Sequence, residues 1–538
     1  MNSKIILLAL TLKKETEEIG ICSIASFLKS NNFDVDVYSF EITKLNDDIW
    51  NNILKSQPKY IGISIYDATK NAVYFLCQKL KELCPSVIII VGGAEAYCNP
   101  EKILLEERCI DFVIYGEGEQ TILELIQEIA ADKKDFHHIH GISYIKNDSI
   151  IITPPRNLME SIKELPMPDR SIFIDNKIRV GNIVSSRGCR GNCSFCLSPS
   201  IWHKNSTRWR GIDVNDVINQ IEWFVSKGIR LISIRDSSYE DPSINRMIDI
   251  AESIMKRGLR IYYSVNFRPS IYKIINNDIL DLLKKSGLIK VFIGVESFNN
   301  KDLKLYNKGV TVFDNIHSLQ FINENDITVQ FGFINFNPYS TMDNLLENYY
   351  NLKKIQYISP SNLYSYSTAL RLYPKTVLYD KIKADDLLYN DDRGLGYRFK
   401  DERVARLAKA LFSFFDEYNN KCGEIVALDL SDKYIDLLSI LEKELVEYND
   451  LTESIKTIKN STKHMIVEHF HKHDYFYELI TLAQYNWDDY LAREIFMKAY
   501  NYQKHNNIIV EVKNKRKALL KKIYSNDLFC KNLIKTLF

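Results

Sequence analysis

The first 130 residues alternate short apolar runs with helical stretches, and this alternation constrains the fold more than any other feature. The runs that we expect to form strands cover residues 4–10, 33–40, 60–66, 87–93 and 111–119. Several runs are apolar on both faces, which is typical of strands in a parallel sheet that helices cover on both sides. The pattern predicts a doubly wound, Rossmann-like (flavodoxin-like) α/β domain.

Glycine or polar residues follow three of these strands, at the sheet edge where such folds bind ligands. Glycine is useful at this edge because it lets the backbone approach a bulky ligand closely. The candidate ligand-binding residues are Ser64, Tyr66, Gly92, Gly93, Gly116 and Glu117.

A second series of strands and helices begins near residue 173. Its expected strands cover residues 182–186, 230–237, 260–266, 290–297, 329–335 and 362–368. Six such units predict a partial (β/α)6 barrel, with its chemistry at the carboxyl ends of the strands. Prolines in the connector indicate a linker with a hairpin, and apolar residues at helical spacing predict a helical C-terminal domain. We expect the four parts to span residues 1–135, 136–172, 173–400 and 401–538.

The composition excludes several classes of protein. With 538 residues the chain is too long for one ordinary core, so several domains are expected. Lys plus Arg number 70 and Asp plus Glu number 69, which argues against a nucleic-acid or membrane partner. The N-terminal apolar run is too short for a secretory signal, and no run is long enough to span a bilayer. We therefore expect a cytoplasmic protein with reduced cysteines.

Three of the ten cysteines lie within eight residues, after the first strand of the second series. They are Cys189, Cys193 and Cys196. Thiolates are ligands for zinc and for iron–sulfur clusters. A structural zinc site needs four ligands, and a [4Fe–4S] cluster ordinarily takes four thiolates, so three would leave one iron atom open. The spacing favours a catalytic cluster; the alternative is a zinc or redox site completed by a distant histidine such as His203.

The spacing Cys-x3-Cys-x2-Cys, with the aromatic Phe195 before the last cysteine, resembles the signature of the radical SAM superfamily. The segment around it is especially similar to the subgroup that has an N-terminal cobalamin-binding domain. The resemblance implies that the open iron binds the amino and carboxylate groups of S-adenosylmethionine. An electron from a reducing donor would then cleave S-adenosylmethionine to methionine and a 5′-deoxyadenosyl radical.

Other strand ends fit this resemblance. Glu296 in "GVES" matches the family's carboxylate that contacts the ribose of S-adenosylmethionine, and a carboxylate can accept both hydroxyl protons of a diol. Asp236 and Ser237 lie where the family places polar residues near the methionine amino group. Arg268 could bind the methionine carboxylate through a bidentate fork. The alternative for Glu296 is a salt bridge at the end of the strand. The alternative for Arg268 is a structural role at the end of its strand, without a ligand.

The N-terminal series resembles the cobalamin-binding domain of this subgroup, which implies that the six loop residues named above hold cobalamin. No histidine precedes His137, so the axial-histidine motif of some cobalamin enzymes is absent. The segment "GGAEAYCNPE" (92–101) departs from the Gly-Gly-x-His-x-Thr run that is common in this domain. The alternative is therefore that the domain keeps the fold as a scaffold without the cofactor.

These patterns lead to one expected function and several rivals. We expect a radical SAM enzyme that takes hydrogen from an unactivated carbon of a small-molecule or peptide substrate and methylates it with cobalamin. The alternative within this architecture is rearrangement, cyclisation or oxidation without methyl transfer. A non-catalytic ligand sensor and a methylthiotransferase are further rivals; the latter needs three more N-terminal cysteines, and those present do not match its positions.

Overall fold

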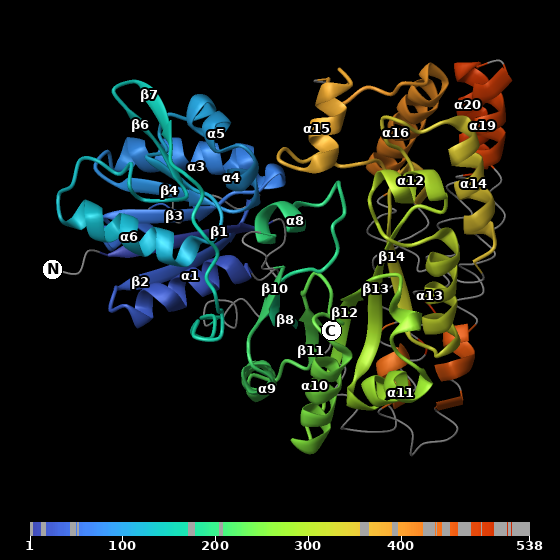
Figure 1. Cartoon of the computed structure of the whole chain (residues 1–538), viewed down its shortest axis with the longest axis horizontal. Helices are drawn as coiled ribbons and strands as arrows, with labels where there is room; N and C mark the ends of the chain where they lie inside the picture. The colour runs from blue at the N-terminus through green and yellow to red at the C-terminus, as the bar shows by residue number, and fades with distance from the viewer. Residues whose placement is uncertain are drawn as a thin grey trace. The chain divides into compact units, whose positions relative to one another are not determined.

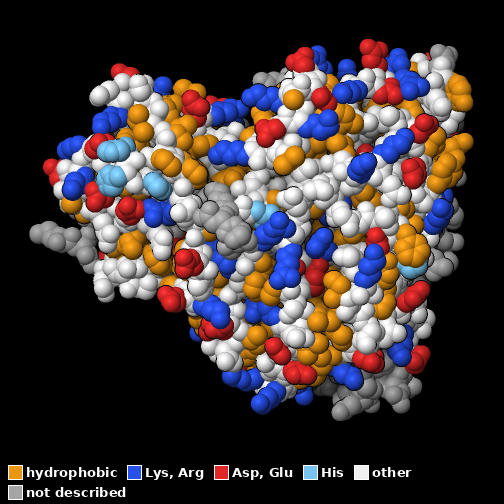
Figure 2. Space-filling model, in the orientation of Figure 1, with side chains coloured by type: hydrophobic (Ala, Val, Ile, Leu, Met, Phe, Trp, Pro, Cys, Tyr) orange, Lys and Arg blue, Asp and Glu red, His pale blue; other side chains and the backbone are white. Residues whose placement is uncertain are grey.

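The computed structural model describes residues 4–11, 18–42, 50, 53–170, 178–203, 208–355, 365–389, 396–422, 436, 438–443, 452–453, 455–460, 475–485, 487–499, 514 and 518. The chain forms two compact units. Unit 1 comprises Met1–Gly188 with Ile201–Ile229, and unit 2 comprises Cys189–Ser200 with Arg230–Phe538. On the face that Figure 2 shows, basic and acidic side chains are interspersed over both units, as their nearly equal numbers suggest.

The described part of unit 1 contains a seven-stranded sheet in the order β2-β1-β3-β4-β5-β6-β7 (Figure 1). Its strands are β1 (Ile5–Thr11), β2 (Val35–Glu41), β3 (Tyr60–Ser64), β4 (Ile88–Gly92), β5 (Phe112–Ile114), β6 (Ile142–Lys146) and β7 (Ser149–Ile152). The first five strands pair in parallel, and β6 and β7 add to β5 in antiparallel orientation. The hairpin expected in the connector therefore forms, and it extends the sheet of the first domain.

Helices cover both faces of this sheet. They are α1 (Ile19–Ser30), α3 (Lys70–Leu83), α4 (Ala94–Cys98), α5 (Pro100–Glu106) and α6 (Gly118–Ala130), with the short 3₁₀ turn η2 (Asp67–Thr69). Figure 1 shows α1 and α6 side by side, with the sheet between them and α3 and α5. Every residue of β1 is buried, as a central strand covered on both faces requires. The predicted doubly wound domain is confirmed.

Four shorter elements complete the described part of unit 1. They are β8 (Val180–Ile183), β9 (Ser186–Gly188), β10 (Trp209–Gly211) and α9 (Val214–Ser226). Strands β9 and β10 pair in antiparallel orientation, which places Arg187 opposite Arg210. The strand expected over residues 182–186 is thus split in two.

Unit 2 holds four parallel strands in the order β14-β13-β12-β11. They are β11 (Leu231–Ile234), β12 (Tyr262–Phe267), β13 (Leu288–Glu296) and β14 (Thr328–Phe333). The helices are α8 (Leu197–Trp202), α10 (Ile244–Lys256), α11 (Asn277–Ser286), α12 (Asn300–Leu305), α13 (Val312–Glu324), α14 (Met342–Lys353), α15 (Val377–Ala384), α16 (Glu402–Cys422), α19 (Tyr475–Tyr485) and α20 (Asp489–Ala499), with the 3₁₀ turn η3 (Ile271–Lys273). The parallel strands and their helices confirm the predicted barrel segment, and the described C-terminal elements are helical.

One expected strand is wrong in its described part. Residues 365–367 of the strand predicted over 362–368 form a 3₁₀ turn, and a bridge forms instead between Ala369 and Phe336. The hydroxyl of Thr368 donates to the carbonyl of Ser365 at 2.7 Å. Such local side-chain bonds compete with strand pairing, which explains the turn.

Candidate functional site

The loop that carries the three cysteines lies in unit 2, between β9 and α8 in the chain. None of its cysteines is in a disulfide, and each is half-buried. Burial raises the pKa of Cys189 to about 11, although the Gly191 N–H donates to its sulfur at 3.2 Å. Burial also raises the pKa of Cys196. Thiolates in this loop therefore need nearby positive charge, which a bound iron–sulfur cluster supplies.

Several hydrogen bonds fix the cysteine loop to the rest of unit 2. The N–H and hydroxyl of Ser194 donate to the carbonyls of Tyr306 and Leu305, at 2.8 and 2.7 Å. The side-chain amide of Asn307 donates to the carbonyl of Asn192 at 2.8 Å. The Arg190 N–H donates to the carboxylate of Asp241, also at 2.8 Å. The carbonyls of Leu305 and Tyr306 and the side chain of Asn307 thus hold the middle of the loop.

Glu296 ends β13 in an unusual conformation. Its φ is 67°, in the left-handed region that non-glycine residues rarely adopt, and its carbonyl accepts the Ile334 N–H at 2.7 Å. Its carboxylate lies over two glycines that pair in register, Gly294 of β13 and Gly332 of β14. A Cβ atom at Gly294 would lie 2.8 Å from the Glu296 Oε1. Strained backbone of this kind gathers at functional sites because the surrounding structure must hold it.

Lys308 pairs with Glu296 and was not expected from the sequence. Its Nζ lies 3.2 Å from the Glu296 Oε1, and only 8% of the residue is exposed. Burial acts to lower its pKa, but Glu296, Cys193 and Cys196 outweigh burial and raise it. Lys308 also lies 6.0 Å from the centre of the Phe195 ring, which itself packs against Tyr306. A buried cation therefore faces both the cysteine loop and the expected ribose ligand.

Of the other predicted residues in unit 2, the structure brings Arg268 to the cysteine loop. Its Nε lies 3.6 Å from the position of a Cβ at Gly191, and its charge acts to lower the pKa of Cys189. Asp236 is buried and its carbonyl accepts the Asn266 side-chain amide at 2.8 Å, whereas Ser237 is exposed. The roles of these three residues remain predictions.

Glu240, which the sequence reasoning missed, is better placed than Asp236. It is 5% exposed, and its Oε1 accepts the Arg268 N–H at 2.9 Å. Its Oε2 has no hydrogen-bond partner among the described residues, and burial raises its pKa to about 7. A buried carboxyl with one open oxygen suits a ligand that donates a hydrogen bond. The only sequence signal was its place after β11, where several polar residues compete.

In unit 1, the predicted cobalamin residues gather at one sheet edge. Ser64 and Gly92 end the neighbouring strands β3 and β4, and Gly116 follows β5. Gly93 and Gly116 have φ values of 116° and 95°, which favour glycine. A Cβ at Gly116 would meet no atom within 4 Å, so its backbone is open to a bulky ligand. This edge fits cobalamin, and the individual contacts remain predictions.

Two members of that set are engaged within unit 1. The hydroxyl of Tyr66 donates to Glu18 at 3.0 Å, and burial raises its pKa to about 12. Glu117 is 5% exposed and pairs with Arg187 at 2.8 Å and with Arg210 at 3.0 Å. Because two guanidinium groups already satisfy its carboxylate, we no longer assign the side chain of Glu117 to a ligand.

Two features of the described residues bear on the expected metal site and on membrane association. No group of three or more His, Cys, Asp or Glu side chains there is arranged around a single metal ion. A cubane cluster spreads its thiolates over separate iron atoms, so it does not require such a group. Within the same described part of the chain, we find no helix with the length and apolar character needed to cross a membrane.

Comparison with known families identifies both parts of the chain. A model of the B12 binding domain matches residues 5–126, and a model of the radical SAM superfamily matches residues 183–348. The chain belongs to the radical SAM superfamily and carries an N-terminal B12-binding domain. This radical SAM enzyme therefore uses a [4Fe–4S] cluster, S-adenosylmethionine and cobalamin, as the resemblance implied. Enzymes of this superfamily act on small-molecule substrates and need an electron donor.

Curated relatives of this radical SAM enzyme carry several names. An uncharacterized methyltransferase of Pyrococcus horikoshii is 27% identical over 379 residues, covering 69% of this chain and 79% of the relative. A candidate methylthiotransferase of Methanocaldococcus jannaschii is 30% identical over 351 residues, covering 62% and 71%. An anaerobic magnesium-protoporphyrin IX monomethyl ester cyclase of Rubrivivax gelatinosus is 26% identical, covering 61% of this chain. The chain spans 60% of that cyclase's length.

A solved structure matches the fold over nearly the whole chain. The cobalamin-dependent S-adenosylmethionine radical enzyme OxsB, with aqua-cobalamin and S-adenosylmethionine bound, has a TM-score of 0.70. The match covers 99% of this chain and 83% of OxsB at 19% identity. At this identity the likeness shows the fold alone, and it agrees with the predicted fold class.

Proposed function

We propose that this radical SAM enzyme is a cobalamin-dependent methyltransferase that methylates an unactivated carbon of a small-molecule or peptide substrate. One observation carries the proposal: the cysteine loop, Glu296 and the buried Lys308 lie together in a chain that also has a B12-binding domain. The relative named as a methyltransferase, which the chain covers over 79% of its length, supports it. When bound, the cluster and S-adenosylmethionine supply a 5′-deoxyadenosyl radical, and cobalamin supplies a transferable methyl group.

Within this proposal, each residue of unit 2 has a binding task. Cys189, Cys193 and Cys196 hold the cluster, because they are the half-buried thiols of one hydrogen-bonded loop. Glu296 binds the ribose diol, and Lys308 positions its carboxylate over the paired glycines. These tasks are binding and orientation, and they leave the radical chemistry to the cofactors.

Two further residues bind the methionine part of S-adenosylmethionine in this proposal. Arg268 lies beside the Cys189 sulfur and offers a planar donor pair for the carboxylate. Glu240 offers its open Oε2 to the amino group. For the amino group we prefer Glu240 to the sequence candidates Asp236, which is buried, and Ser237, which is exposed, because its Oε2 has no partner among the described residues.

In unit 1, we assign cobalamin to the edge formed by Ser64, Tyr66, Gly92, Gly93 and Gly116. The support is geometric, because neighbouring strands end there and the Gly116 backbone is open. The first histidine of the chain is His137, so no residue of these early loops supplies an imidazole ligand.

The second candidate is cyclisation, rearrangement or oxidation without methyl transfer, which the relative named as a cyclase favours. Methylthiotransfer is less favoured, although one relative is named for it. Cys22 and Cys77 are fully buried in α1 and α3, so these thiols are not presented at a sheet edge as ligands of a second cluster.

The test has two steps. The protein would be purified without oxygen, reconstituted with iron, sulfide and cobalamin, and assayed for cobalamin per cluster. It would then be incubated, with dithionite as the reductant, with a metabolite extract and S-adenosylmethionine that carries a deuterated methyl group. Near one cobalamin per cluster, with a product that gains a labelled methyl group on carbon, supports the proposal. An intact cluster without cobalamin, or a product with no added methyl, overturns it and favours the second candidate.

A further inference from the structure

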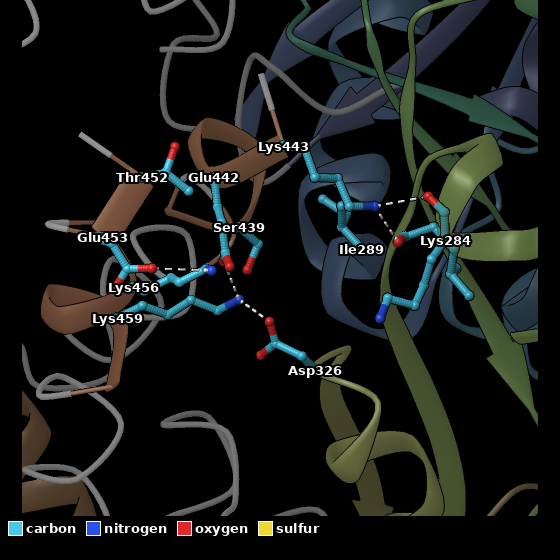
Figure 3. Close-up of a pocket in the computed structure, with 11 residues that line it drawn as sticks. Lys284, Ile289, Asp326, Ser439, Glu442, Lys443, Thr452, Glu453, Lys456 and Lys459 are labelled. Carbon is cyan, nitrogen blue, oxygen red and sulfur yellow. Dashed lines mark hydrogen bonds and ion pairs between the residues drawn. The ribbon is translucent and has the colours of Figure 1, made fainter. Parts of the chain in front are cut away.

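A hollow of about 440 Å³ lies in unit 2 where the C-terminal helical segments meet the start of β13 (Figure 3). Lys284, Leu288 and Ile289 line it from α11 and β13, and Ser439 and Lys443 line it from the C-terminal part. Figure 3 shows Lys443 beside Ile289 and Lys284, with Ser439, Glu442 and Lys459 on the other side of the hollow. Its volume lies within the range of small-molecule sites.

The hollow also lies far from the cofactor site. Leu288 begins β13 and Glu296 ends it, and eight residue steps along a strand span roughly 26 Å. In barrels of this kind the chemistry lies at the carboxyl ends of the strands, whereas this hollow lies at the amino end of β13. An occupant here would therefore be neither the substrate nor S-adenosylmethionine.

The charges that line the hollow do not balance. Among the described residues, four lysines and three acidic residues line it. Lys459 pairs with both Asp326 and Glu442, at 2.8 and 3.0 Å, and Lys456 pairs with Glu453 at 3.5 Å. All three acidic side chains of the lining are thus engaged by these two lysines.

Lys284 and Lys443 are the two lining lysines that no acidic residue of the lining pairs with. The Nζ of Lys443 donates to the carbonyls of Lys284 and Leu288, both at 3.0 Å, so backbone oxygens rather than carboxylates hold it (Figure 3). Among the described residues, Lys284 pairs only with Asp281, which lies outside the lining, at 4.0 Å. Burial, followed by the charges of Lys284 and Lys459, lowers the pKa of Lys443 to about 8. Bringing an anion into the hollow would relieve this repulsion.

A second observation independently points to a ligand. Ser439 is 6% exposed, and its hydroxyl has no hydrogen-bond partner among the described residues. Buried hydroxyl groups without a partner are rare, because burial without a hydrogen bond costs free energy. Ser439 lines the hollow together with Lys443, so an oxygen atom bound there could accept from both.

We propose that this hollow is a binding site for a phosphate group carried by a small organic molecule. The Lys443 ammonium and the Ser439 hydroxyl donate to the phosphate oxygens, and Lys284 adds its charge. The buried side chains of Leu288 and Ile289 contact the organic part. The site is separate from the proposed methyl transfer and does not depend on it.

The test uses the full-length holoenzyme and inorganic phosphate as the probe. Equilibrium dialysis with radiolabelled phosphate, at constant ionic strength in chloride, measures its dissociation constant. We expect saturable binding that weakens at least tenfold in Lys443→Met and at least threefold in Ser439→Ala. A matched control, Lys381→Met, removes a lysine of α15 that pairs with Asp385 and should bind phosphate as the wild type does.

Several results would overturn the proposal. If the wild type shows no saturable phosphate binding, the site is refuted. Unchanged affinity in both Lys443→Met and Ser439→Ala also refutes it. If Lys443→Met does not fold, the phosphate affinity of Ser439→Ala decides the test. This substitution removes one buried hydroxyl oxygen that has no hydrogen-bond partner among the described residues. Equal weakening in the Lys381→Met control would show that the effect is general electrostatics, which also refutes the site.

Discussion

The Nζ of Lys308 and the Oε1 of Glu296 lie 3.2 Å apart above two glycines that pair across neighbouring strands. A Cβ at Gly294 would lie 2.8 Å from both atoms, and one at Gly332 would lie 3.1 Å from the other carboxylate oxygen. Buried ion pairs are costly to desolvate, so their geometry must be held well. The paired glycines provide the space, and Lys308 holds the carboxylate in it.

Replacing Lys308 with methionine should impair the binding of S-adenosylmethionine. Removal of one partner from a buried pair leaves the other charge uncompensated, which typically costs about 3–5 kcal/mol. We expect at least a tenfold loss of affinity, measured by equilibrium dialysis on reconstituted protein, with partial rescue in Lys308→Arg. Lys273→Met, which removes an exposed lysine, is the control. Unchanged affinity with full iron content would contradict a positioning role.

Replacing Gly294 with alanine should also impair the use of S-adenosylmethionine, through steric crowding rather than through the loss of a charge. The added methyl group would displace both the Glu296 carboxylate and the Lys308 ammonium. We expect 5′-deoxyadenosine formation to fall at least tenfold, measured by chromatography after reduction. Gly20→Ala is a matched control, because a Cβ there meets no atom within 4 Å. Equal activity in the two variants would refute the glycine argument.

Replacing Cys193 with alanine should remove the iron–sulfur cluster and leave cobalamin binding unchanged. Cys193 belongs to unit 2, whereas the expected cobalamin residues belong to unit 1. We expect iron content and S-adenosylmethionine cleavage to be lost while cobalamin binding stays near the wild-type level, measured on one preparation. Cys84→Ala, a half-buried cysteine outside the loop, should keep both cofactors. Retention of the cluster in Cys193→Ala would exclude this thiol as a ligand.

Glu240 should make stability depend on pH in a defined window. Burial raises its pKa from the ordinary 4.5 to about 7, so the folded state holds the proton more tightly than the unfolded state. Its stabilising contribution is complete below pH 4.5 and is lost as the pH rises through about 7, with a ceiling of about 3 kcal/mol. Thermal unfolding of cofactor-free protein between pH 5 and 8 should show this loss in the wild type and not in Glu240→Gln. Parallel pH profiles would refute it.

The buried arginine network of unit 1 should be needed for stability. Arg187 pairs with Glu117 and Glu119, and both carboxylates are buried. Burial raises the pKa of Glu119, but Arg187 outweighs burial and lowers it. Arg187→Met should lower the free energy of unfolding of unit 1 by about 3–5 kcal/mol, measured with urea. Lys29→Met, at an exposed pair with Asp169, should lower it by less than about 1 kcal/mol.

Elements with a regular period could be predicted from the sequence, whereas contacts between distant loops could not. The strands of both series were expected within a few residues of their bounds, because buried parallel strands are continuous apolar runs. The three cysteines of the loop could be recognised from their spacing in the sequence. Lys308 and Glu240 carry no motif, because their importance arises only when loops far apart in the sequence meet. The strand over 362–368 failed because a local hydroxyl bond turned the chain at Thr368.

Residues 305–307 hold the cysteine loop through the carbonyls of Leu305 and Tyr306 and the side-chain amide of Asn307. The same residues lead directly to Lys308, which pairs with Glu296. Loss of iron from the cysteine loop through oxidation would loosen the contacts of residues 305–307. An enzyme damaged by oxygen would then bind S-adenosylmethionine more weakly, in addition to losing the cluster that supplies the electron. Because the cysteine loop and Lys308 both depend on residues 305–307, we expect iron loading and the binding of S-adenosylmethionine to be coupled.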